Sequence, residues 1–134
     1  MDIRPLSDRY AVSPQIAPDD AEEIAAAGYR TVVCNRPDAE VPPELQSAAV
    51  GEAMRAAGLS FVVLPLTHDT LRGRVAEHRA AIGEGPTLAY CASGTRSTIV
   101  WALGEAPETG ADGVIEAAAR VGYDLSTLRP ELES

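Results

Sequence analysis

Three apolar runs recur along the chain, and each one ends at a polar or small-residue loop. They cover Tyr29–Cys34, Leu59–Leu66 and Thr87–Tyr90. Short runs of apolar and β-branched residues bounded by turn residues are typical of buried strands. A fourth run, Arg9–Ser13, stops before Pro14 and predicts a short edge strand.

Helical patterns separate these strands. Pro18, Asp19 and Asp20 are typical of a helix start, because proline suits the first turn and carboxylates favour the positive end of the helix dipole. Gly28 is suited to cap that helix, and a second helix is expected over Pro42–Gly58. A third helix is expected to place Leu71, Val75 and Ile82 on its inner face. A fourth should begin near Arg96 and end at a break formed by Pro107 and Gly110. Two more are expected over 110–121 and 124–133.

Strand and helix alternation predicts an α/β fold, with a mostly parallel central sheet flanked by helices on both faces. We expect residues 1–134 to form one domain, because no linker or repeat interrupts the pattern. Ligands of such sheets bind outside the carboxyl ends of the strands. The loops 35–38, 67–70 and 91–97 should therefore meet there and form a site.

Composition narrows the possible partners. The formal net charge is -9, which argues against nucleic acid and anionic membranes as partners. Two cysteines are too few for a disulfide framework, and the first residues contain no apolar signal segment. These features predict a soluble cytoplasmic protein whose thiols stay reduced.

The segment after the third strand carries the candidate chemistry. Cys91 ends that strand, and Arg96 lies in the first turn of the following helix. Backbone N–H groups of the loop, the helix end and the Arg96 guanidinium all favour an anion, and they favour the thiolate form of Cys91. The segment therefore predicts a cysteine nucleophile below an anion-binding loop, which consists of Ala92, Ser93, Gly94 and Thr95.

Four other side chains are candidates, each with a structural alternative. The Ser97 hydroxyl could donate to the Cys91 thiolate, or it could satisfy the helix end. Asp69 could protonate a leaving group, or it could cap the next helix. His68 is a second possible acid, or it is only a solvated loop residue. Arg36 could contact substrate or brace the Cys91 loop.

Two more residues are interpreted as structural. Cys34 ends an inner strand and is expected to be a core thiol, and His78 falls near the inner face of its helix. No His, Cys, Asp and Glu cluster has metal-ligand spacing, so neither a metal nor another cofactor is predicted.

Several segments together resemble a known family. They are Cys34-Asn35-Arg36-Pro37-Asp38, Leu64-Pro65-Leu66, Gly85 through Ser97, and Gly122-Tyr123-Asp124. The chain is similar to the beta-lactamase-hydrolase-like, phosphatase-like domain family, and its loop resembles those of tyrosine phosphatases and rhodaneses. The resemblance implies a protein-tyrosine-phosphatase-like fold. Some members of the family are fused to a persulfide dioxygenase, which implies a persulfide-oxidising enzyme as a partner.

Loop length separates two chemistries. Tyrosine phosphatases have five residues between cysteine and arginine, whereas four residues separate Cys91 from Arg96, as in many rhodaneses. This favours a sulfurtransferase that carries a persulfide on Cys91, with Arg96 binding an anionic donor such as thiosulfate or a persulfide. The alternative is a phosphatase that forms a phosphocysteine on Cys91. A third hypothesis is a non-catalytic, anion-binding regulatory module.

Overall fold

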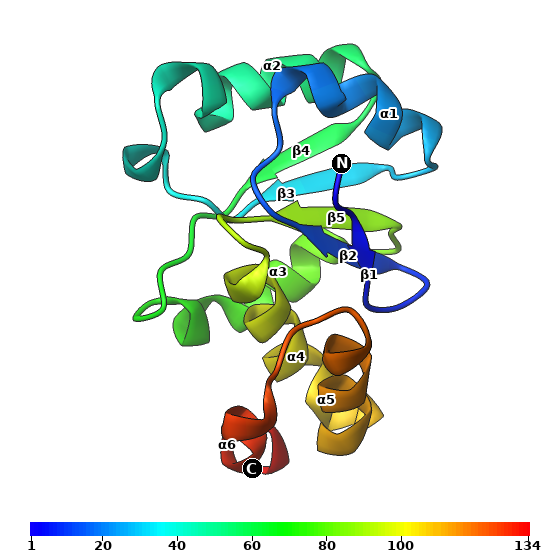
Figure 1. Cartoon of the computed structure of the whole chain (residues 1–134), viewed down its shortest axis with the longest axis vertical. Helices are drawn as coiled ribbons and strands as arrows, with labels where there is room; N and C mark the ends of the chain where they lie inside the picture. The colour runs from blue at the N-terminus through cyan, green and yellow to red at the C-terminus, as the bar shows by residue number, and fades with distance from the viewer.

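The computed structural model describes all 134 residues and is built around a five-stranded sheet (Figure 1). The strands lie in the order β1-β2-β5-β3-β4, with β1 antiparallel to β2 and every other pair parallel. This arrangement confirms the predicted α/β fold with a mostly parallel sheet. The strands are β1 (Arg4–Pro5), β2 (Tyr10–Ser13), β3 (Thr31–Cys34), β4 (Ser60–Val63) and β5 (Thr87–Tyr90).

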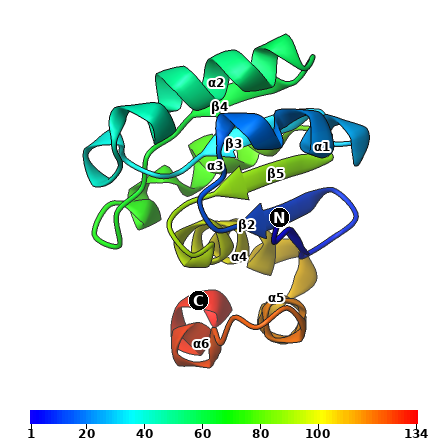
Figure 2. The same ribbon diagram turned by 45° about the horizontal axis from the view of Figure 1, so that its top comes forward.

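Helices cover both faces of the sheet. Figures 1 and 2 show α1 (Ala21–Ala26) and α2 (Ser47–Ala56) on one face, and α3 (Val75–Ile82) and α4 (Thr95–Thr109) on the other. Two more helices, α5 (Ala111–Arg120) and α6 (Arg129–Glu133), pack on α4 as an outer layer. Short 3-10 turns complete the chain: η1 (Pro18–Asp20), η2 (Asp38–Glu40), η3 (Pro43–Leu45), η4 (Leu71–Arg74) and η5 (Ser126–Leu128).

The strand residues alternate between two apolar cores. Val32 and Leu88 pack with residues of α1 and α2, including Ile24 and Met54. Residues one position further along the strands, such as Val33, pack against α4, α5 and α6. Successive side chains of a strand point to opposite faces, so a sheet covered on both faces needs apolar residues at every strand position. The continuous apolar runs in the sequence meet this need.

Two strand expectations are wrong in their placement. β2 is not an edge strand, because Arg4 and Pro5 pair with it on one side and β5 pairs on the other. β4 is not a fully buried strand: it pairs only with β3, and Val63 at its end is 49% exposed. Both corrections have one cause. The order of strands in a sheet depends on pairing between distant segments, which apolar runs do not encode.

The predicted break at Pro107 is also wrong. α4 continues through Pro107 to Thr109 and ends at Gly110, whose φ is +90°. A proline inside a helix lacks the N–H that would bond the carbonyl four residues earlier, and its ring crowds that carbonyl, but α4 still continues for two residues beyond Pro107. No helix is long and apolar enough to span a bilayer.

Candidate active site

The carboxyl ends of β3 and β5 bring the candidate residues together. Cys34 lies opposite Tyr90 in the parallel register, and the N–H of Asn35 donates to the Tyr90 carbonyl at 2.8 Å. Asn35 and Cys91, the residues that follow these two strands, therefore leave the sheet side by side. The Cys91 side chain lies at this edge and is almost fully buried.

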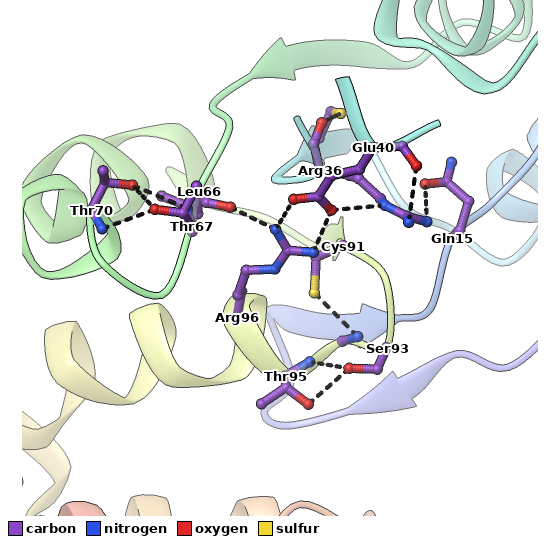
Figure 3. Close-up of polar contacts among 12 residues, drawn as sticks. Gln15, Arg36, Glu40, Leu66, Thr67, Thr70, Cys91, Ser93, Thr95 and Arg96 are labelled. Carbon is purple, nitrogen blue, oxygen red and sulfur yellow. Dashed lines mark hydrogen bonds and ion pairs between the residues drawn. The ribbon is translucent and has the colours of Figure 1, made fainter. Parts of the chain in front are cut away.

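The loop after Cys91 turns back over its sulfur. The backbone N–H of Gly94 donates to Cys91 Sγ at 3.2 Å, a contact that stabilises negative charge on the sulfur (Figure 3). Gly94 has a φ of +94°, and a Cβ at this position would collide with the Tyr123 hydroxyl. That hydroxyl donates to the Ser93 carbonyl at 2.8 Å. Glycine is therefore required by both the backbone turn and the close approach of Tyr123.

The first turn of α4 supplies further anion donors. The backbone N–H groups of Arg96 and Ser97 have no hydrogen-bond partner within the protein, and the first helical bond is from Thr98 to the Gly94 carbonyl. Unpaired N–H groups at a helix start carry the positive end of its dipole. An anion above Cys91 would be favoured by these donors.

Arg96 presents one edge of its guanidinium to this loop. Its Nη1 donates to Glu40 Oε2 at 2.9 Å and to the Leu66 carbonyl at 2.8 Å, and its Nη2 donates to Glu40 Oε1 at 2.8 Å. A guanidinium has five donors, so the Nε–H and the second Nη2–H remain as an adjacent pair. Figure 3 shows the guanidinium between Glu40 and the Cys91 sulfur. The free pair matches two oxygens of a bound oxyanion.

Glu40 connects two arginines at the site. Its Oε1 accepts from Arg36 Nε at 3.2 Å as well as from Arg96. The Arg96 guanidinium, with Arg36 contributing, lowers the pKa of Glu40, and the Glu40 carboxylate raises the pKa of Arg96. Arg96 is 8% exposed, so this charge is held in place rather than left to move in solvent. Arg36 therefore contacts the site indirectly, through its hydrogen bond to the Glu40 carboxylate.

Ser97 makes its side-chain hydrogen bond to Asn35 and not to the Cys91 thiol. Its Oγ donates to Asn35 Oδ1 at 2.8 Å, and its side chain is fully buried. Cys34 is buried on the α1 and α2 side of the sheet, where burial raises the pKa of its thiol. The same desolvation, with a smaller contribution from Cys34, raises the pKa of Tyr90.

Asp69 and His68 lie on an exposed turn after Leu66. Thr67 and Thr70 hold this turn with reciprocal hydrogen bonds from backbone N–H to side-chain hydroxyl, at 3.0 and 3.1 Å. Neither the Asp69 nor the His68 side chain has a hydrogen bond to Cys91, Arg96 or the loop between them. The segment touches the site through the backbone carbonyl of Leu66 (Figure 3).

Sequence reasoning missed Glu40, and it named Tyr123 only within a segment that resembles the family, without a role at the site. Glu40 lies four residues after Arg36, a spacing that suggests an ion pair only when the backbone between the two residues is helical. Tyr123 is thirty positions from Ser93, and nothing local in the sequence connects them. The structure contains no group of three or more His, Cys, Asp or Glu that could hold a metal ion. The largest surface groove, about 600 Å³, lies between α3 and α4 and includes neither Cys91 nor Arg96.

The fold and the site define a class. A cysteine directly after a central parallel strand, with an arginine in the next helical turn, is the arrangement of a protein-tyrosine-phosphatase-like α/β protein. The fold agrees with that of Tk-PTP in its active form, at 20% identity and a TM-score of 0.66 over 98% of this chain and 92% of that one.

The family follows from the sequence comparisons. The profile described as beta-lactamase hydrolase-like protein, phosphatase-like domain matches residues 2–108, and the chain belongs to this family. A putative phosphatase from Neisseria meningitidis is 34% identical, with a TM-score of 0.85 over 98% of this chain and 96% of its own.

Longer relatives contain the same domain. A Beta-lactamase hydrolase-like protein of Xylella fastidiosa is 37% identical over 108 residues, which are 78% of this chain and 25% of the relative. One from Agrobacterium fabrum is 29% identical over 104 residues, 75% of this chain and 24% of its own. This chain thus spans about a quarter of the length of these curated relatives.

Proposed function

We propose that this chain is a cysteine-dependent phosphatase that hydrolyses small phosphoesters through a phosphocysteine at Cys91. The observation that carries the proposal is the arrangement above the Cys91 sulfur. There the free edge of Arg96 and the unpaired N–H groups of Arg96 and Ser97 provide donors for several oxygens of one anion.

Binding of the phosphoryl group would use the donors that the protein itself leaves free. The Nε–H and Nη2–H of Arg96 take two oxygens, and the helix N–H groups take the third. Glu40 and the Leu66 carbonyl hold the opposite edge of the guanidinium, so Arg96 does not have to be ordered when the substrate arrives.

The chemistry proceeds in two displacements at phosphorus. In the first, the Cys91 sulfur forms a bond to phosphorus and the bond to the ester oxygen breaks, releasing an alcohol or phenol that takes up a proton. In the second, water attacks phosphorus, the sulfur–phosphorus bond breaks, and inorganic phosphate leaves with the thiolate restored. The Gly94 N–H, 3.2 Å from Sγ, stabilises that thiolate at both ends of the cycle.

Relatives support a phosphoester substrate. The Neisseria meningitidis protein is described as a putative phosphatase. A structural neighbour, TpbA of P. aeruginosa, was crystallised in complex with pTyr; it is 19% identical, with a TM-score of 0.61 over 98% of this chain and 90% of its own. None of the comparisons supports sulfur transfer, the activity that loop length favours. It is retained as the second candidate because only four residues separate Cys91 from Arg96.

The decisive experiment measures both activities on the same preparation. We expect hydrolysis of p-nitrophenyl phosphate, abolished in Cys91→Ser, and a phosphocysteine adduct on Cys91 in rapidly quenched wild-type protein. Thiosulfate-dependent sulfur transfer with a persulfide on Cys91 and no phosphate release would reverse the order of the two candidates. Phosphate binding without either turnover would indicate the regulatory module.

The protonation of the leaving group is tested separately. We propose Asp69 as the acid, since it lies on the exposed turn just beyond Leu66. p-Nitrophenolate leaves without protonation, whereas phenolate benefits from an acid. Asp69→Asn should therefore slow phenyl phosphate hydrolysis about a hundredfold while affecting p-nitrophenyl phosphate much less. His68→Asn is the matched control on the same turn, and equal effects of Asp69→Asn on both substrates would exclude the role.

A further inference from the structure

A group of fully buried polar side chains lies beneath the candidate active site. Tyr10 comes from β2, Asn35 from the end of β3, His78 from α3 and Ser97 from the first turn of α4. We refer to the hydrogen bonds that join these four residues as the circuit. Four polar residues from four elements are costly to bury unless their hydrogen bonds are satisfied.

The orientation of the Asn35 amide follows from its neighbours. Its nitrogen lies 2.9 Å from the Leu64 carbonyl, which can only accept, so the nitrogen must face that carbonyl. The amide oxygen then faces Ser97 Oγ at 2.8 Å. An amide oxygen can only accept, and the Ser97 proton is therefore directed to Asn35 rather than to Cys91.

The tautomer of His78 follows in the same way. The second N–H of the Asn35 amide points to His78 Nδ1 at 3.5 Å, so Nδ1 must be unprotonated and accept. Burial lowers the pKa of His78 to about 4, which leaves the ring neutral, and an accepting Nδ1 places its proton on Nε2. Nε2 lies 2.9 Å from the Tyr10 hydroxyl, which in turn donates to the Ser97 carbonyl at 2.8 Å.

These contacts form a closed circuit with one direction. It runs from the Ser97 hydroxyl through Asn35, His78 and Tyr10, and it returns to the Ser97 carbonyl. Each member donates once within the circuit and accepts once, and the Asn35 amide and the Ser97 carbonyl fix its direction, because an amide nitrogen can only donate and a carbonyl oxygen can only accept. Such a network specifies a single arrangement of the elements that it joins.

We infer that Tyr10, Asn35 and His78 are positioning residues of the candidate active site, which act by holding Ser97 and the first turn of α4 in one orientation. In this role Ser97 belongs to the circuit and does not donate to the Cys91 thiolate. The circuit sets the direction of the two unpaired N–H groups of Arg96 and Ser97, because it holds both the side chain and the carbonyl of Ser97. The kinetic part of this inference rests on the proposed phosphatase function; the hydrogen-bond circuit does not.

The circuit is tested directly by NMR. The protein has two histidines, so the imidazole ring signals in nitrogen-15 spectra of the uniformly labelled chain come only from His78 and the exposed His68, which serves as an internal reference for a solvated ring. We expect His78 in the Nε2–H tautomer at pH 7. In Asn35→Asp the carboxylate can no longer donate to Nδ1, and we expect a proton to appear on Nδ1. A wild-type Nδ1–H tautomer would overturn the circuit.

Kinetics test the positioning role. Misdirected donors weaken the transition state more than the bound substrate, so Tyr10→Phe and Asn35→Ala should lower kcat for p-nitrophenyl phosphate about tenfold to a hundredfold with little change in KM. His78→Phe should behave similarly. His78→Gln, whose amide can both donate and accept, should restore most of kcat. Equal losses in His78→Gln and His78→Phe at equal melting temperature would mean that hydrogen bonding through the ring is irrelevant.

The reactivity of the Cys91 thiol distinguishes the two roles considered for Ser97, as a donor to the thiolate or as a member of the circuit. If Ser97 donated to the thiolate, Ser97→Ala would change the rate at which iodoacetamide alkylates Cys91, whereas Asn35→Ala would not. The circuit predicts equal rates in the two variants, and the double variant should be no worse than either single one. If the protein hydrolyses no phosphoester, the proposed function fails, and the tautomer and alkylation results still decide the circuit.

Discussion

Acidification provides a sharp test of how the core is built, because His78 is buried as a neutral ring. Its pKa is lowered by desolvation to about 4 from the ordinary value of 6.5. Between these two values the unfolded chain binds a proton that the folded chain excludes, so the free energy of unfolding falls as the pH decreases. This contribution of His78 to the free energy of unfolding is fully present above pH 6.5 and is lost progressively as the pH falls from there towards 4.

The size of the effect follows from the shift. A difference of about 2.5 pKa units corresponds to about 3 kcal/mol in total, of which about 2 kcal/mol is lost by pH 5. That is a large share of the roughly 5 to 15 kcal/mol by which a domain is stable. Carboxylates with lowered pKa values, such as Glu40, lose their contribution mainly at lower pH, so the interval from pH 7 to pH 5 isolates His78.

Urea unfolding at a series of pH values measures the effect. His78→Gln keeps a donor and an acceptor at this place but does not titrate, so its stability should change little between pH 7 and pH 5. His68→Gln is the matched control, because it removes the exposed histidine and should leave the wild-type profile intact. Parallel profiles for wild type and His78→Gln would refute the reasoning.

Two further substitutions test the residues that surround the Cys91 thiol. Glu40→Gln removes the charge that orients Arg96, and we expect kcat/KM for p-nitrophenyl phosphate to fall about tenfold with the melting temperature nearly unchanged. An unchanged kcat/KM would show that Arg96 does not need the Glu40 carboxylate. Gly94→Ala adds a Cβ at a φ of +94° against the Tyr123 hydroxyl, and it should abolish turnover and cost more than the about 1–2 kcal/mol of a left-handed backbone alone. Gly28→Ala, at a φ of +98° with no neighbour within 4 Å, measures that backbone cost by itself.

Local patterns in the sequence were sufficient for much of the fold. The apolar runs ending at Cys34 and Tyr90 predicted two central strands, since a sheet covered on both faces needs apolar residues at every strand position. Cys91, four small residues and Arg96 predicted an anion loop, because the strand, turn and helix that place them are contiguous in the chain. The resemblance of this loop to those of tyrosine phosphatases and rhodaneses implied the phosphatase-like fold, whereas its length favoured sulfur transfer, which the comparisons do not support.

Tertiary structure alone decided how distant segments meet. The strand order β1-β2-β5-β3-β4 placed β2 inside the sheet and β4 at its edge, although the sequence predicted an edge strand over Arg9–Ser13 and a buried strand over Leu59–Leu66. The partners of Arg96, namely Glu40 and the Leu66 carbonyl, lie 56 and 30 positions away in the chain. A backbone carbonyl carries no side-chain signal, and a glutamate in a 3-10 turn is indistinguishable in sequence from a solvated one.

The direction of the Ser97 proton shows the division most clearly. The sequence by itself determined that a hydroxyl follows Arg96 at a helix start, and it left open whether that hydroxyl serves the thiolate or the structure. Only the fold brought Asn35 to its side, from 62 positions away, with an amide oxygen that can do nothing but accept. Residue chemistry is local and can be read along the chain, whereas a hydrogen bond's direction depends on which groups the folded backbone places within reach.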